Sequence, residues 1–213
     1  MKRILLAALT CIPIYAQAAD VAQTLATQGN KQGATACQAC HGEDGGGMAA
    51  AGFPRLAGLD AGYIKQQLMN FRSGNRNHDV MQPIAKSLSK KEVALIAEYY
   101  AALPVPASAP EGGEAALLRK GETLATVGDW DHEIPACFQC HGPGGKGMGA
   151  SFPALTGQSA MYISSQIQAF KSGTRTNDPA GLMKSVSDKL LADQVEAVSA
   201  FLANQQSTNG TQQ

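Results

Sequence analysis

The pentapeptide Cys37-Gln38-Ala39-Cys40-His41 recurs one hundred residues later as Cys137-Phe138-Gln139-Cys140-His141. The pattern C-x-x-C-H is the attachment signature of a c-type haem. Its two cysteines form thioethers with one porphyrin, and its histidine supplies an axial nitrogen to the iron. The two copies therefore predict two covalently bound haem c groups, each with a protein ligand already in place. The residues expected to hold them are Cys37, Cys40, Cys137 and Cys140, with His41 and His141 as iron ligands.

The sequence around the two motifs is duplicated. At an offset of 99 to 100 positions both halves carry Gly-Met, Phe-Pro-x-Leu-x-Gly, Tyr-Ile-x-x-Gln and Phe-x-Ser-Gly-x-Arg. A repeat of this kind sets the architecture of a chain. We expect an N-terminal domain over residues 20–103 and a C-terminal domain over 115–204. We also expect a signal peptide at 1–19, a proline-rich linker at 104–114 and a polar, disordered tail at 205–213.

Each unit shows apolar residues at helical spacing and no strand pattern, which predicts an all-α fold. The first helices are expected at roughly Val21–Gln28 and Ala115–Val127. Capping residues mark the starts of later helices: Asp60, Ser159, and Ser89 with Glu92 in a capping box. Units of this size have little core of their own, so we expect each to need its haem for a stable fold.

The sixth ligand of each iron decides what the haem does, because a second protein ligand favours electron transfer and an open position allows binding or catalysis. Met81 and Met183 lie 40 and 42 residues after the motif histidines. We predict that they are the distal ligands, the His/Met pattern of electron-transfer haems. Met48 and Met148 also repeat, but only seven residues after the histidines, in a glycine-rich loop expected to follow the haem edge. His78 has no counterpart, so a bis-histidine first haem stays open beside the favoured interpretation of a surface loop residue.

Other residues are candidates for enclosing or tuning the haems. A carbonyl at Pro54 or Pro153 is expected to accept a hydrogen bond from the proximal imidazole. Arg55 has no counterpart, and a propionate partner or a plain surface charge are equally open for it. The repeated pair Arg76 and Arg175 is expected to have a structural role or to bind a propionate. The repeated pair Tyr63 and Tyr162 is expected to pack at a haem edge or at the domain interface.

The N-terminus predicts export. Lys2 and Arg3 precede an apolar run too short to span a bilayer, and Ala18 or Ala19 offers a cleavage site. A lipoprotein signal at Cys11 fits less well. We therefore expect a periplasmic protein whose mature cysteines all belong to the haem motifs. The formal net charge is zero, and neither a basic tract for nucleic acid nor a second apolar segment is present.

These residues and motifs resemble the cytochrome c4 family over nearly the whole mature chain. The resemblance implies two tandem class I cytochrome c domains, each wrapped around one covalent haem and related by a pseudo-two-fold, with Met81 and Met183 as distal ligands. It also implies a periplasmic electron carrier between a donor such as a quinol-oxidising complex and a haem-copper terminal oxidase, loosely associated with the membrane. An insertion at 179–181 in the second unit leaves the equality of the two distal sites open.

Other functions remain to be compared with this one. The main alternative is an electron-transfer subunit of a dehydrogenase, in the manner of a flavocytochrome. A dihaem peroxidase needs a haem that can open, and neither unit has an evident acid–base residue beside its distal loop. A pair of zinc sites would have only three ligands each, where structural zinc takes four.

Overall fold

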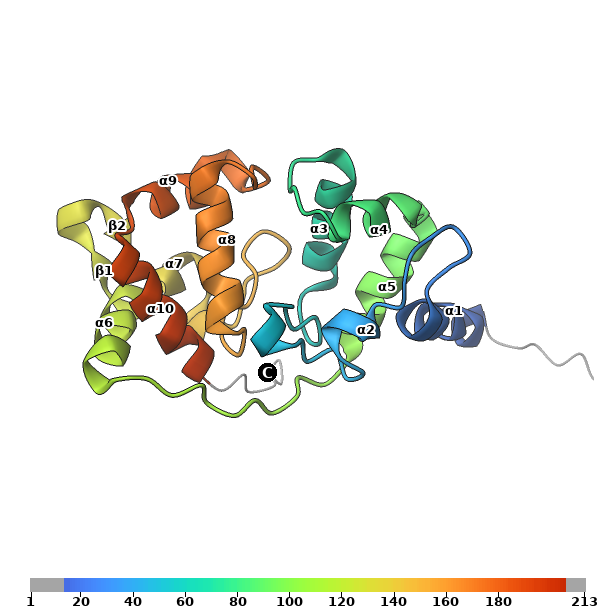
Figure 1. The fold of residues 1–213 in the computed structure, drawn as a ribbon, viewed down its shortest axis with the longest axis horizontal. Coiled ribbons are helices and arrows are strands. Elements are labelled where there is room, and N and C mark those ends of the chain that lie inside the picture. The colour runs from blue at the N-terminus through green and yellow to red at the C-terminus, as the bar shows by residue number, and fades with distance from the viewer. Residues whose placement is uncertain (1–13, 206–213) are drawn as a thin grey trace, which may run out of the picture.

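The computed structural model describes residues 14–205, which form two helical halves joined by a coil (Figure 1). The first half contains α1 (Ile14–Gln28), α2 (Gln38–His41), η1 (Ala49–Ala51), α3 (Ala61–Ser73), α4 (Met81–Ser87) and α5 (Lys90–Ala102). The second half contains α6 (Ala115–Thr126), β1 (Gly128–Asp129), η2 (Trp130–His132), β2 (Ile134–Pro135), α7 (Cys137–His141), η3 (Pro143–Gly145), α8 (Ala160–Ser172), η4 (Pro179–Gly181), α9 (Leu182–Lys189) and α10 (Ala192–Asn204). The predicted all-α class is confirmed.

The helices begin at the residues that the sequence marks. The Asp60 carboxylate accepts a hydrogen bond from the Tyr63 amide at 2.9 Å, which satisfies one of the free N–H groups at the start of α3. Ser89 and Glu92 form the expected capping box at the start of α5. The first helix differs from the expectation, because α1 begins at Ile14 and continues through the predicted cleavage region. The rest of the predicted signal peptide, residues 1–13, lies outside the described residues.

The two halves repeat one packing scheme. In the first half α1 packs on α5, and α3 packs on α4 and α5; in the second, α6 packs on α10, and α8 packs on α9 and α10. Gly121 shows how close α6 and α10 approach. A Cβ at this position would lie 2.1 Å from the Ala197 carbonyl oxygen, so only glycine fits there. Each half buries its own apolar cluster between these helices.

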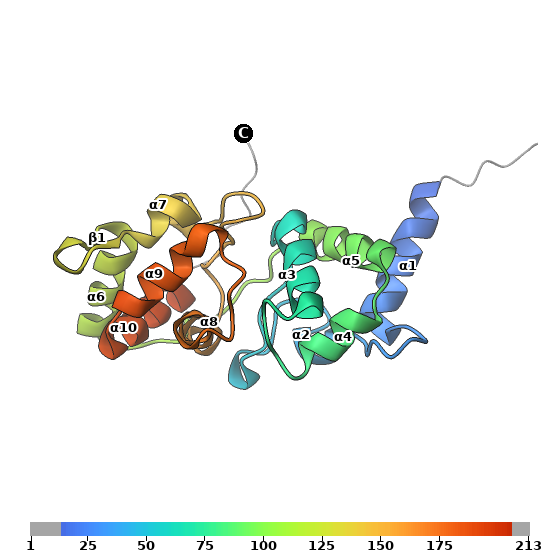
Figure 2. The same cartoon turned by 90° about the horizontal axis from the view of Figure 1, so that it is seen from above.

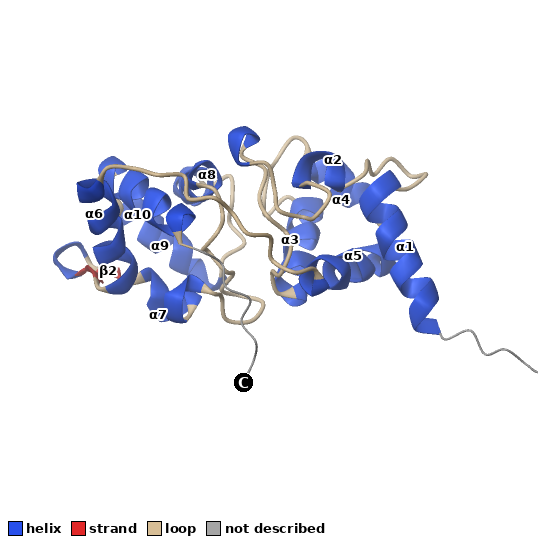
Figure 3. Cartoon of the chain, turned by 90° about the horizontal axis from the view of Figure 1, so that it is seen from below, coloured by secondary structure: helices blue, strands red, loops and turns tan. Residues whose placement is uncertain are grey.

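A small hairpin distinguishes the second half. β1 pairs antiparallel with β2, and Gly128 lies opposite Pro135. Two-residue strands are too short to show an alternating pattern, which is why the sequence did not predict them. Figure 3, coloured by secondary structure, shows how little of the chain is strand. Within residues 14–205, no helix combines the length and the apolar character needed to cross a bilayer.

The halves meet through matching segments in a pseudo-two-fold arrangement. Figure 2 shows α3 and α8 on the facing sides of the two halves. Beyond the ends of these helices the backbones of Arg76 and Arg175 form an isolated antiparallel β-bridge. The Asn77 amide donates to the Thr174 carbonyl at 2.8 Å, and the Thr176 amide donates to the Asn75 carbonyl at 2.8 Å. Each half thus makes the same backbone contact with the other.

Candidate haem-binding sites

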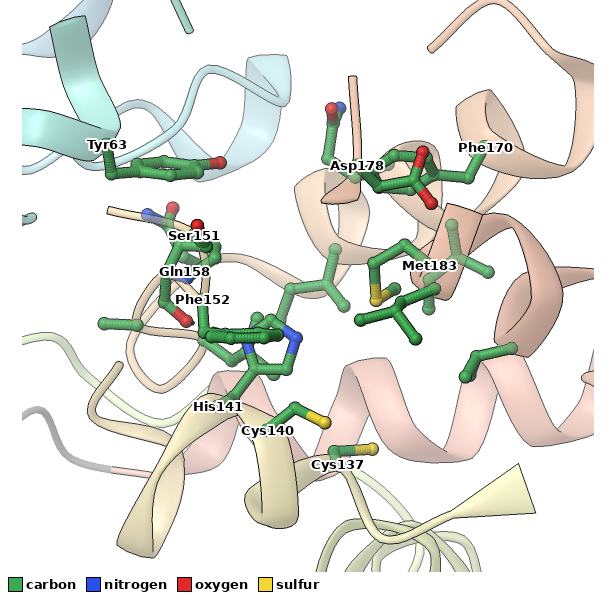
Figure 4. A pocket seen from close by; sticks show the side chains of 18 of the residues that line it. Tyr63, Cys137, Cys140, His141, Ser151, Phe152, Gln158, Phe170, Asp178 and Met183 are labelled. Atoms are coloured by element: carbon green, nitrogen blue, oxygen red, sulfur yellow. Dashed lines mark hydrogen bonds between the residues drawn. The ribbon is translucent and has the colours of Figure 1, made fainter. Parts of the chain in front are cut away.

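The second half contains a cavity lined mainly by apolar side chains, into which the predicted ligands point (Figure 4). Cys137, Cys140 and His141 reach it from α7, and Met183 reaches it from α9 on the opposite side. The nitrogen of an imidazole and the sulfur of a thioether therefore face one another across an apolar space. The two thiols lie at the floor of the same space, beside the histidine.

The first half has an equivalent cavity. Cys37, Cys40 and His41 line it from α2 and the residue before it, and Met81 lines it from the start of α4. The four predicted ligating or attaching residues of each unit thus come together, although they are spread over more than 40 positions of sequence. Every cysteine in the described part of the chain is a free thiol, so all four are available for thioether bonds.

Both motif histidines are oriented by a proline carbonyl, as predicted. His41 Nδ1 lies 2.9 Å from the Pro54 oxygen, and His141 Nδ1 lies 2.8 Å from the Pro153 oxygen. A carbonyl oxygen can only accept, so each Nδ1 carries the hydrogen and each Nε2 keeps its lone pair. Burial lowers the pKa of both imidazoles, which favours the neutral form that binds metal.

Of the alternative distal ligands, the two methionines lie outside these cavities and only the histidine lines one. Met48 and Met148 are 45% and 54% exposed, and neither lines the space beside its histidine. His78 does line the first cavity, but its Nδ1 accepts from the amides of Val80 and Met81 at 3.3 Å. His78 therefore caps the helix that carries the predicted ligand.

The insertion in the second unit changes this cap. Residues 179–181 form the short helix η4, in which Ala180 has a φ of 53°, an unusual value for a residue other than glycine. Asp178 takes the role of His78, since its carboxylate accepts from the Lys184 amide at 3.0 Å. The two distal loops differ in path, yet both bring a methionine to the cavity wall.

Two buried arginines lie between the cavities. Arg76 donates to Gln67 of its own half at 3.1 Å and to the Tyr162 hydroxyl of the other half at 2.9 Å. Arg175 mirrors it, with bonds to Gln166 at 3.0 Å and to the Tyr63 hydroxyl at 3.2 Å. Each guanidinium also lies over a phenylalanine ring of its own half. The tyrosines thus lie at the domain interface, as one of the expectations had it.

The charge of this cluster fits the acidic groups of haem. Arg76 and Arg175 are 7% and 6% exposed as whole residues. The hydrogen-bond partners of their guanidiniums within residues 14–205 are amides and phenols rather than carboxylates. Burial, and then the neighbouring charge of Arg76, lowers the pKa of Arg175. Each haem carries two propionates, which would supply the missing negative charge at the mouths of both cavities. The apolar walls, paired thiols, neutral imidazoles and buried cations together fit two haem c groups.

The position of Arg55 matches neither of the two expected roles, that of a propionate partner or that of a surface charge. It is 4% exposed, and its guanidinium donates to the Thr156 carbonyl of the other half at 3.0 Å and to the Ala57 carbonyl. The backbone of Arg55 is held by the side chain of Gln158. Sequence reasoning missed Gln158 entirely. The signal available was that both positions break the repeat, with Ala154 opposite Arg55 and Leu59 opposite Gln158.

Family models match each half of the chain. The model described as cytochrome c matches residues 119–206, and the model described as cytochrome c oxidase, cbb3-type, subunit III matches residues 24–99.

Curated relatives match over most of the chain. A thiosulfate dehydrogenase electron acceptor of Stutzerimonas stutzeri is 49% identical over 91% of this chain and 89% of its own length. The protein of the same description from Thiomonas intermedia is 50% identical, over 81% and 79% of the two chains. A cytochrome c4 of Thiocapsa roseopersicina is 38% identical, over 78% and 85%.

Two solved structures share the fold. A thiosulfate dehydrogenase, TsdBA, of Marichromatium purpuratum superposes with a TM-score of 0.81 and 43% identity. The match covers 88% of this chain but only 40% of that longer protein. The reduced cytochrome c4 of Pseudomonas stutzeri superposes with a TM-score of 0.76 and 32% identity, over 88% of this chain and 98% of its own.

Proposed function

Because the chain belongs to the cytochrome c4 family and is a dihaem electron carrier, we propose that the electrons it carries come from a thiosulfate dehydrogenase. The observation that carries the proposal is the difference in similarity. Relatives described as thiosulfate dehydrogenase electron acceptors are 49% and 50% identical to the chain, against 38% or less for the cytochromes c4. This favours the dehydrogenase-linked alternative for the donor.

A solved structure supports the same donor. The TsdBA protein has a segment similar to this chain within a polypeptide of more than twice the matched length. A link of this kind between two redox modules would raise the effective concentration of one at the other. We propose that this chain meets its donor through a small interface of the kind that redox partners use.

The two sites are suited to taking electrons one at a time. We propose His41 and Met81 as the axial ligands of the first iron, and His141 and Met183 as those of the second. A haem closed by two protein ligands exchanges electrons without binding substrate, so no bond is made or broken at either site. The thioether sulfur favours ferrous iron, which makes both haems ready acceptors. The covalent thioether links keep the haems in place through each cycle.

The expected location of the protein suggests where its electrons go next. The basic residues and the apolar run at the start of the sequence support export and a periplasmic site of action. From there, the reduced protein would deliver its electrons to a haem-copper terminal oxidase. A quinol-oxidising complex is the competing donor.

Reduction kinetics test the donor. The oxidised dihaem protein is mixed with catalytic amounts of a thiosulfate dehydrogenase and an excess of thiosulfate, and the ferrous absorption bands are followed over time. We expect reduction of both haems, at a rate proportional to dehydrogenase concentration and absent without it. The cytochrome c4 of Thiocapsa roseopersicina serves as the comparison acceptor. Equal rates for the two acceptors, or reduction of neither, would refute a dedicated thiosulfate dehydrogenase donor.

A further inference from the structure

One peptide unit links the first histidine to the second half of the molecule. The carbonyl of Pro54 accepts the hydrogen bond from His41 Nδ1 at 2.9 Å. The N–H of the same peptide bond belongs to Arg55, and it donates to Gln158 Oε1 at 3.0 Å. A side chain of the second half is therefore one peptide group away from the imidazole of the first.

The orientation of the Gln158 amide is fixed by a second hydrogen bond. Gln158 Nε2 donates to the Arg55 carbonyl at 2.8 Å, so the nitrogen and oxygen cannot be exchanged without losing both bonds. Gln158 is 4% exposed, which shields the pair from competing water. Gln158 thus clamps both polar backbone groups of Arg55.

The duplicated unit does not repeat this contact. The position that matches Gln158 is Leu59, which has no hydrogen-bonding group in its side chain. The carbonyl of Pro153 still orients His141, but the apolar Leu59 offers no acceptor to the following amide, that of Ala154. Both histidines therefore donate to a proline carbonyl. Gln158 accepts from the peptide N–H that follows the first of these carbonyls, and Leu59 cannot do the same for the second.

We propose that Gln158 is a positioning residue that lowers the reduction potential of the first haem relative to the second. Hydrogen bonds in a chain polarise one another, so a bond to the Arg55 N–H strengthens the Pro54 carbonyl as an acceptor. A stronger acceptor gives the His41 imidazole more anionic character and makes it a better donor to iron. A better nitrogen donor stabilises the ferric state. This inference rests on the ligation of iron by His41 proposed above.

The test replaces Gln158 with leucine, the residue of the matching position, in the full-length dihaem protein. The potential of each haem is followed by NMR during a redox titration, from haem methyl signals assigned to each domain. We expect the equilibrium constant for reduction of the first haem to rise about two- to fivefold, since each bond in such a chain strengthens the next only partly. This is a shift of about 20 to 40 mV, because a tenfold change corresponds to about 59 mV for one electron.

The second haem distinguishes this mechanism from a change in packing. Gln158 lines the second cavity and not the first. A packing effect would therefore shift the second haem most, whereas loss of the hydrogen-bond chain shifts the first. The His41 Nδ1 proton signal should move in the same variant, while that of His141 stays. A shift confined to the second haem would overturn the proposal.

Two further variants keep the test decisive. Gln158→Met retains the length of the side chain, and it should reproduce the effect even where leucine disturbs folding. Thr176→Val removes another hydrogen bond between the halves, 3.2 Å long, at a residue that lines neither cavity, and should leave both reduction potentials unchanged. Unchanged reduction potentials in Gln158→Met, with both histidines still bound to iron, would refute the role of Gln158 and leave the iron assignment in place. Absence of histidine ligation at the first haem of the unmodified protein would refute the iron assignment as well.

Discussion

Replacing Gln67 with methionine should uncouple the two halves. The Gln67 Oε1 atom accepts three hydrogen bonds, from Arg76 at 3.1 Å, Arg175 at 3.1 Å and Asn177 at 2.8 Å. Two of these donors belong to the other half and two are charged. Methionine has nearly the same length and volume but offers no oxygen, so the change isolates the polar contribution.

The expected cost is about 3 kcal/mol in the free energy of unfolding. A hydrogen bond to a charged group contributes about 1.5–3 kcal/mol and a neutral one about 1 kcal/mol. The smallest of these values add up to about 4 kcal/mol. Both guanidiniums keep other acceptors, which recovers part of the loss, so we expect about 3 kcal/mol. A loss of this size corresponds to more than a hundredfold change in the folding equilibrium.

Guanidinium chloride unfolding of the oxidised dihaem protein measures this loss. The single tryptophan, Trp130, lies in the second half. Its fluorescence therefore reports whether a substitution in the first half changes the unfolding of the second. Gln166→Met is the matched control, since Gln166 accepts only from the two arginines and is less buried. It should cost less than Gln67→Met. If the Trp130 transition of Gln67→Met is unchanged, the arginine network does not couple the halves.

Two further predictions concern the haem sites and the capping box. Met183→Ala should open only the second haem of the reduced protein to carbon monoxide, and Met81→Ala only the first; binding at the wrong haem or at neither would contradict the distal assignments. The pKa of Glu92 is lowered overall, since partial burial raises it but hydrogen bonds from the Ser89 amide, the Ser89 capping interaction and Asn30 outweigh that effect. The stabilisation is therefore present above the unfolded pKa of about 4.3 and lost as the pH falls through the lower folded value. Glu92→Gln should flatten the dependence of the melting temperature on pH below about 4.5, and an unaltered acid slope would exclude this role.

Local features of the chain could be predicted from the sequence, because their partners lie nearby or in a repeated motif. The caps at Asp60 and Ser89 and the carbonyls of Pro54 and Pro153 belong to this group. The repeat also pointed to Met81 and Met183, which the structure brings to the cavities of their motif histidines; their bonds to iron stay a prediction.

Features of the interface could not be predicted in the same way. Arg55 contacts residues about a hundred positions away, and its role depends on how one half is placed against the other. A lone arginine beside a haem motif gives no sign of that placement. The paired Arg76 and Arg175 did suggest a shared role, but only the fold shows that each bonds to the opposite tyrosine. The hairpin at Gly128–Pro135 escaped prediction because its strands are two residues long.

The clamp between Gln158 and Arg55 has a consequence for how such a molecule can diverge. In a symmetric dimer of identical chains, every substitution appears on both sides of the axis, so a contact that favours one subunit must favour the other. Tandem fusion removes that obligation. One domain can gain a hydrogen-bond acceptor while the other keeps a leucine at the matching position. A difference in reduction potential between the two metal centres can therefore evolve one residue at a time.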